Sequence, residues 1–133
     1  MSELVPKPVP VPSAVALPYW EGLRRGEFCV QRCAACGTLR HYPRLLCREC
    51  FSDAVDWQAI SGEGHIHSYT VAHYAYHPGF AAELPYTLVT IELTVGLRAL
   101  GRWLGDAVPQ IGAPVRMILV PGEPYPTLSF APA

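Results

Sequence analysis

The sequence predicts a mainly β fold, in which a short helix and a small metal-held ribbon precede a closed barrel of short strands. Two observations predict it. Two CxxC pairs lie between residues 33 and 50, and after Trp57 short segments rich in β-branched and aromatic residues alternate with glycine-containing turns. The chain has 133 residues, enough for a small module joined to a modest domain. We therefore expect a tail (1–16), a helix with a ribbon (17–56) and a barrel (57–133).

The tail carries proline at positions 6, 8, 10 and 12. Alternating proline favours an extended polyproline geometry without internal hydrogen bonds. We expect residues 1–16 to be flexible until a partner holds them.

The segment after the tail has the spacing of a short helix. Leu17, Trp20 and Leu23 fall on one helical face, and Gly26 is a suitable C-terminal stop. Gly22 lowers the helix propensity, so this helix should depend on packing against another element. We expect Trp20 to anchor the helix in the core; contact with a partner is the alternative for Tyr19 and Trp20.

The two CxxC pairs form a set of four metal ligands: Cys33, Cys36, Cys47 and Cys50. Each pair places two sulfurs on one tight turn, and the ten residues between the pairs allow a short hairpin to bring the turns face to face. Zinc prefers four ligands in a tetrahedron and binds thiolates well. Because four cysteines fill the coordination shell, we predict a structural zinc ion in a rubredoxin-like ribbon, with no catalytic role.

Other uses of the cysteines fit less well. A thioredoxin-like redox motif explains one CxxC pair but not two, and it needs a βαβ context. The odd count of five cysteines and the absence of a signal peptide argue against disulfides. We expect Cys29 to be a buried small residue on a ribbon strand; the alternative is an alternate metal ligand.

The second half of the chain contains five short strand-like segments separated by turns. The expected strands cover residues 65–76, 85–93, 97–104, 115–120 and 127–130. Gly101 lies inside the third of them and suggests a bulge or a bend. Five short strands with glycine bends favour a small OB-type barrel over a sandwich.

Candidate sites outside the cysteines are few. His65, His67 and His73 recur on one strand face, but a cupin-like metal site needs a glutamate where Ala72 stands. We favour a solvated or partner-facing surface for these histidines. The sequence shows no GxSxG nucleophile motif and no phosphate-binding glycine loop, so we expect no catalytic residues.

Charge is unevenly distributed along the chain. Residues 21–50 carry six arginines against three glutamates, whereas residues 51–133 carry three arginines against seven acids. Four thiolates and one zinc ion sum to −2, so arginines near the cysteines are expected on that ground alone. The net charge is −1, and nearer −3 with metal bound, which disfavours nucleic-acid binding.

No apolar run is long enough to span a membrane. We expect a soluble, cytoplasmic protein.

The order of these features resembles a known family. The segments YWEGLRRGEF, QRCAACGTLRHYPRLLCREC, SGEGHIHSYTV, LPYTLVTIEL and IGAPVRMIL follow the pattern of the zinc-ribbon/OB-fold family of unknown-function domains associated with acyl-CoA enzymes. The four cysteines match the family's zinc ligands; Tyr19, Trp20 and Arg44 match its pattern without a settled role. Phe51 stands where a glycine often follows the second pair, which makes that turn harder to build.

The resemblance implies an accessory role. Members of the family accompany thiolase-like enzymes, including aldolases of steroid side-chain breakdown, and others accompany hotdog-fold hydratases; the partner supplies the catalytic residues. We therefore expect a non-catalytic subunit that stabilises a thiolase-like thiolase or aldolase and helps form its acyl-CoA site. Arg40, Arg44 and Arg48 are candidate contacts with the coenzyme A phosphates, or serve the interface or the zinc charge instead.

Two other functions are open at this point. A single-stranded nucleic-acid-binding module would use Tyr69, Tyr74 and Tyr76 as stacking platforms, although the acidic barrel opposes it. A free-standing acyl-CoA enzyme or carrier lacks an evident nucleophile and base.

Overall fold

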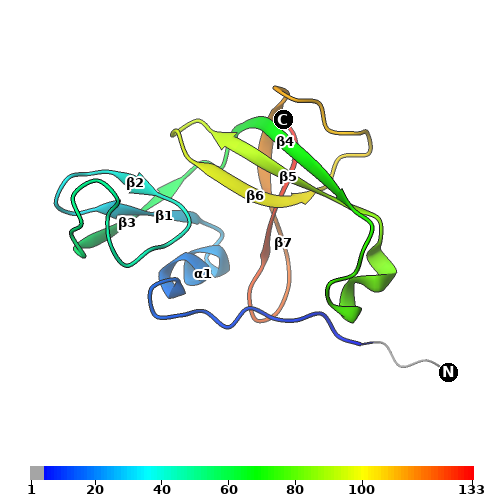
Figure 1. The fold of residues 1–133 in the computed structure, drawn as a ribbon, viewed down its shortest axis with the longest axis horizontal. Coiled ribbons are helices and arrows are strands. Elements are labelled where there is room, and N and C mark those ends of the chain that lie inside the picture. The colour runs from blue at the N-terminus through cyan, green and yellow to red at the C-terminus, as the bar shows by residue number, and fades with distance from the viewer. Residues whose placement is uncertain (1–4) are drawn as a thin grey trace.

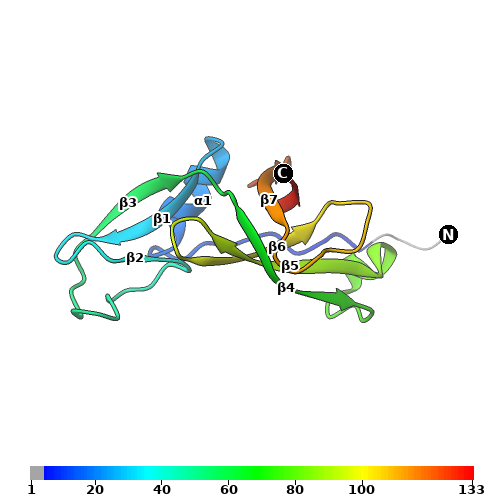
Figure 2. The ribbon, with the colours of Figure 1, turned by 90° about the horizontal axis from the view of Figure 1, so that it is seen from above.

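The computed structural model describes residues 5–133 and consists of a helix-backed ribbon beside a closed barrel (Figures 1 and 2). The elements are α1 (Leu17–Arg24), β1 (Phe28–Cys33), β2 (Leu39–Arg40), β3 (Val55–Ile60), β4 (Gly64–Ala72), the 3₁₀ helix η1 (Pro78–Glu83), β5 (Tyr86–Leu93), β6 (Arg98–Trp103), β7 (Pro114–Val120) and β8 (Thr127–Pro132). The predicted fold class is therefore confirmed.

The ribbon is a three-stranded antiparallel sheet in the order β2-β1-β3. The central strand β1 is almost entirely buried, and β3 pairs along its whole length, from Cys33 opposite Val55 to Phe28 opposite Ile60. The ribbon sheet thus continues to Ile60, a few residues past the start of the expected barrel segment.

The barrel closes in the order β4-β5-β6-β8-β7, with β7 returning to β4. Every ladder is antiparallel except the short parallel contact of β6 with β8. Alternate side chains point inward, so that Val89, Ile91 and Leu93 of β5 are buried. The first barrel strand ends at Ala72, earlier than the expected residue 76. Residues 73–77 form a loop that leads into η1, and His77 caps that helix.

Gly101 is needed for close packing rather than for a bulge. The β5–β6 ladder runs without a register shift past Gly101, and a Cβ there would lie 2.8 Å from the Phe130 ring. The one register shift in the β4–β5 ladder falls between Ile66 and Ser68. The expected bulge at Gly101 is therefore wrong, and the alternative of a bend stays a prediction. The glycine lets β8 approach β6.

Helix α1 covers the ribbon, and its buried face differs from the expected one. Tyr19 and Leu23 are buried, Trp20 is only half-buried, and Leu17 is exposed. Gly22 faces β1, where a Cβ would lie 2.9 Å from the Cys29 Sγ. The helix therefore uses a glycine to lie close to the strand. Leu23 and Tyr19 are its buried anchors, and Trp20 packs against the core while only half-buried.

One hydrophobic core runs from the helix and ribbon into the barrel. Buried side chains of α1 and β1 form a single cluster with barrel residues such as Ile66 and Phe130. The two parts are also joined by a hydrogen bond and by an aromatic contact: the Leu100 amide donates to the Tyr42 hydroxyl at 2.9 Å, and the ring centroids of Tyr125 and Trp20 are 5.5 Å apart.

The proline-rich segment runs beneath the barrel towards α1 from Val5 onward (Figure 1). Lys7 pairs with Glu83 of η1 at 2.9 Å. The first four residues of the expected flexible tail lie outside the described part of the chain, and the flexibility of residues 5–16 stays a prediction.

In residues 5–133 no helix combines the length and apolar character that a membrane crossing requires.

Candidate metal centre and its surroundings

Two equivalent tight turns present the four cysteines. In the first turn the Gly37 amide donates to the Cys33 carbonyl at 2.8 Å; in the second the Phe51 amide donates to the Cys47 carbonyl at 2.9 Å. The residue that ends each turn has a positive φ, 81° at Gly37 and 62° at Phe51. Phe51 thus adopts a backbone conformation that favours glycine. This agrees with the expectation that a phenylalanine at this position makes the second turn harder to build.

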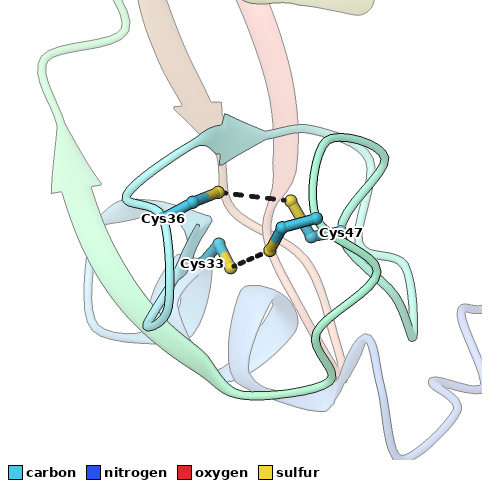
Figure 3. Close-up of side chains that lie close together, drawn as sticks. Cys33, Cys36 and Cys47 are labelled. Carbon is cyan, nitrogen blue, oxygen red and sulfur yellow. Dashed lines mark hydrogen bonds between the residues drawn. The ribbon is translucent and has the colours of Figure 1, made fainter.

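The sulfurs converge on one point between the turns (Figure 3). The Sγ atoms of Cys33 and Cys50 are 3.6 Å apart, as are those of Cys36 and Cys47, and all four lie within 4.8 Å of one another. A tetrahedron with Zn–S bonds of about 2.3 Å has edges of about 3.8 Å. The donor set and its spacing therefore fit a four-coordinate zinc ion.

Backbone amides favour the thiolate forms that a metal requires. Amides of Cys36 and of Cys50 lower the pKa of Cys33 and of Cys47, and the Thr38 hydroxyl lowers that of Cys36. The Ser52 amide also lowers the pKa of Cys50, but hydrogen bonding to Cys33, burial and the other thiols outweigh it and raise that pKa to about 12. Four adjacent thiolates repel one another, so the fourth ionises readily only when a cation is bound.

Cys29 is separate from this cluster. It is 5% exposed on β1, with its Sγ 3.6 Å from a Glu27 carboxylate oxygen. Burial raises the pKa of its thiol, which keeps it protonated. The expectation of a buried small residue is confirmed.

The three arginines singled out from the sequence surround one small cavity of about 60 Å³. Arg40 is 5% exposed, whereas Arg44 and Arg48 are exposed. The Arg40 Nε donates to the Gln31 Oε1 at 2.6 Å, and the same oxygen accepts the Arg44 amide at 2.7 Å. Arg40 therefore also has a structural role, because it holds Gln31 and the backbone of Arg44 in place. Its buried guanidinium faces the cavity.

Sequence reasoning missed His41. Its ring lies 5.4 Å from Tyr19, 5.1 Å from Phe28 and 4.0 Å from Tyr42, and neither nitrogen has a hydrogen-bond partner among the described residues. Burial lowers its pKa to about 4. A single histidine in a loop carries no sequence signal for this aromatic enclosure.

The remaining candidates lie on the barrel surface. His65, His67 and His73 are exposed on or just beyond β4. Tyr69, Tyr74 and Tyr76 are also exposed, and the last two form an edge contact with centroids 4.9 Å apart. In residues 5–133 the four cysteines form the one cluster of three or more side chains suited to a metal.

Comparison with known proteins shows which family this chain resembles. Residues 20–56 match the rubredoxin-like zinc ribbon domain of ChsH2, and residues 57–120 match the C-terminal OB-fold domain of ChsH2. A chain of the solved structure described as "Ltp2-ChsH2(DUF35) aldolase" is 35% identical, and the match covers 93% of this chain and 98% of that chain with a TM-score of 0.84. The chain belongs to the ChsH2 (DUF35) family. It carries the ChsH2 zinc ribbon, and the predicted family and cofactor are confirmed.

Two curated relatives extend the ChsH2 comparison. The "Probable enoyl-CoA hydratase alpha subunit" of Thermomonospora curvata is 39% identical over 120 residues, 86% of this chain and 36% of the relative. The "3-oxo-4,17-pregnadiene-20-carboxyl-CoA hydratase alpha subunit" of Mycobacterium tuberculosis is 34% identical over 100 residues, 74% of this chain and 31% of the relative. The chain spans about a third of the length of the curated relatives it matches.

A more distant structure shares the ChsH2 fold. A DUF35 protein of unknown function from Sulfolobus solfataricus is 16% identical, with a TM-score of 0.61 over 90% of this chain and 86% of that chain. At this identity the likeness concerns the fold alone.

Proposed function

We propose that this chain is a non-catalytic zinc-binding accessory subunit of a thiolase-like acyl-CoA thiolase or aldolase. It stabilises the partner and helps form the acyl-CoA site. The proposal rests on the likeness of this chain, over 93% of its length, to a chain of the Ltp2-ChsH2(DUF35) aldolase. The names of the curated relatives favour acyl-CoA chemistry, including that of steroid side chains. A hotdog-fold hydratase is the second candidate partner, because both curated relatives are named hydratase subunits.

In this proposal Cys33, Cys36, Cys47 and Cys50 are the zinc ligands, and the metal is structural. Bound zinc supplies a cross-link between the two tight turns of the ribbon. Four thiolates leave no open coordination position, which a catalytic zinc normally keeps for water or substrate. The fixed turns in turn hold the loop 41–46, which packs against the barrel through Tyr42.

The zinc side of the ribbon supports the assignment of a partner surface. Leu45, Leu46 and Phe51 are 66%, 47% and 73% exposed, so three large apolar side chains face solvent on either side of the second cysteine pair. Exposed apolar side chains gathered beside arginines are typical of a protein interface. Trp20, half-buried on α1, and the cavity arginines are the further candidate contacts with the partner or with coenzyme A. Tyr19 lies in the core, and we assign it to folding.

Co-expression with a thiolase-like enzyme of the same organism tests the proposal. We expect the two chains to co-purify in a fixed ratio, and we expect the acyl-CoA activity of the enzyme to fall when this chain is omitted. A Leu45→Asp/Leu46→Asp variant should keep its zinc but lose the complex, whereas Val108→Asp, at an equally exposed residue in the β6–β7 loop, should not. A partner that is stable and fully active alone would contradict the proposal.

A further inference from the structure

A small cavity where the ribbon meets the barrel has three arginines among its six lining residues. It has a volume of about 60 Å³, and its walls are Leu39, Arg40, His41, Arg44, Arg48 and Leu97. One water molecule needs about 10–15 Å³ of such space. The cavity therefore has room for a group of a few heavy atoms, such as one carboxylate.

The buried guanidinium of Arg40 forms one wall with an unused donor. Its Nε donates to the Gln31 Oε1 at 2.6 Å, and its Nη2 donates to the Arg44 carbonyl at 3.1 Å. Its Nη1 is buried and has no hydrogen-bond partner among residues 5–133. Both partners of Arg40 are neutral oxygens, so the charge is solvated by dipoles but not compensated. An anion in the cavity would satisfy both the donor and the charge.

Arg44 and Arg48 add to the positive charge. The Arg48 Nε lies 3.4 Å from a Glu49 carboxylate oxygen, but both side chains are more than half exposed, so this pair is weak. No cavity arginine donates a hydrogen bond to the zinc cysteines in the described chain. The hydrogen bonds of these cysteines go to one another, to Thr38 and to backbone amides. No carboxylate is among the six lining residues.

The loop beside the cavity points to a protein rather than a free small molecule as the source of the anion. Tyr42, Leu45 and Leu46, in the same loop as Arg44, are 49%, 66% and 47% exposed. A charged contact flanked by apolar side chains that exclude water is the usual arrangement of an interface hot spot. A guanidinium fork binds carboxylate and phosphate alike, so the apolar loop beside the cavity is what favours a side-chain carboxylate.

We propose that this cavity receives the carboxylate of an aspartate or glutamate side chain from the thiolase-like partner. The proposal rests on the proposed function, because it needs that partner. It commits Arg40, Arg44 and Arg48 to the partner interface rather than to the coenzyme A phosphates.

Two experiments test the cavity, one on the complex and one on the zinc-loaded chain alone. In the complex, Arg48→Gln should raise the dissociation constant roughly tenfold, the loss of one charge-assisted hydrogen bond. Arg116→Gln, which removes another exposed charge, on β7, should leave the dissociation constant within about twofold. In the isolated chain, sodium acetate at constant ionic strength should shift the Arg40 Nε–H resonance saturably. Arg40→Gln should abolish the binding while the zinc content stays at one per chain, which shows that the ribbon is folded.

The outcomes separate the two proposals. Normal assembly of Arg48→Gln would overturn the cavity proposal and leave the proposed function standing. Phosphate or coenzyme A binding in the cavity more tightly than acetate would also overturn it, in favour of a cofactor contact. Saturable acetate binding with no assembly would overturn the proposed function and, with it, the partner as the source of the carboxylate.

Discussion

The enclosed imidazole of His41 predicts a stability that falls with acidification. Its ring is packed among aromatic side chains, and burial lowers its pKa from 6.5 to about 4. In the unfolded chain the pKa returns to about 6.5. Between these two values the unfolded chain binds more protons than the folded chain, so acidification favours unfolding. The stabilisation is complete above about pH 6.5 and is lost as the pH falls towards 4.

The size of the effect follows from the same two pKa values. The difference is about 2.5 units, and each unit corresponds to about 1.36 kcal/mol, so the full loss is about 3 kcal/mol. Between pH 7 and pH 5 the expected loss is about 2 kcal/mol.

Urea unfolding of the wild-type chain and of His41→Phe at pH 7 and pH 5, with excess zinc, measures this loss. Protonation of the zinc cysteines affects both proteins, so it cancels in the difference between them. The free energy of unfolding of the wild type should fall by about 2 kcal/mol more than that of the variant. The same pH slope in both proteins would refute the reasoning, because His41 would then be protonated as easily in the folded chain as in the unfolded one.

Three further substitutions test the packing and the metal site. Cys47→Ser should release zinc and unfold the ribbon first, read as loss of bound zinc in mass spectrometry of the native protein; retention of one zinc per chain would contradict the ligand set. Gly101→Ala should destabilise the chain by about 1–3 kcal/mol, because the new Cβ meets the Phe130 ring at 2.8 Å; the exposed neighbour Leu100→Ala should cost clearly less in the same urea measurement. Tyr42→Phe should cost about 1 kcal/mol, since the Leu100 amide loses its acceptor; an unchanged midpoint would mean that water replaces the hydroxyl.

The metal centre could be predicted from sequence because its signal is local. Two residues between the cysteines of each pair fix each turn, and a ten-residue connection suffices to oppose the turns, so Cys33 and Cys50 meet without information from elsewhere in the chain. The barrel was predictable for a similar reason: β-branched alternation marks β5 and β7, and glycine turns mark their ends.

What the sequence could not provide depends on contacts between distant segments. The purpose of Gly101 depends on Phe130, and that of Gly22 depends on Cys29, neither of which a local pattern identifies. The spacing of Leu17, Trp20 and Leu23 predicted the buried face of α1, but of these only Leu23 is buried, and the face that packs on β1 includes Tyr19 and Gly22. The enclosure of His41 likewise requires Tyr19 of α1 and Phe28 of β1, from two other segments of the chain.

The central claim is that this chain acts by completing a thiolase-like enzyme. The most direct test is the acyl-CoA thiolase or aldolase activity of that enzyme, measured alone and with added zinc-loaded chain. The account predicts that activity rises with the added chain and saturates at a fixed ratio of the two proteins. Adding the Leu45→Asp/Leu46→Asp variant of the chain should leave the activity of the enzyme unchanged. Equal activity with and without the chain, at concentrations where the two are shown to bind, would contradict it.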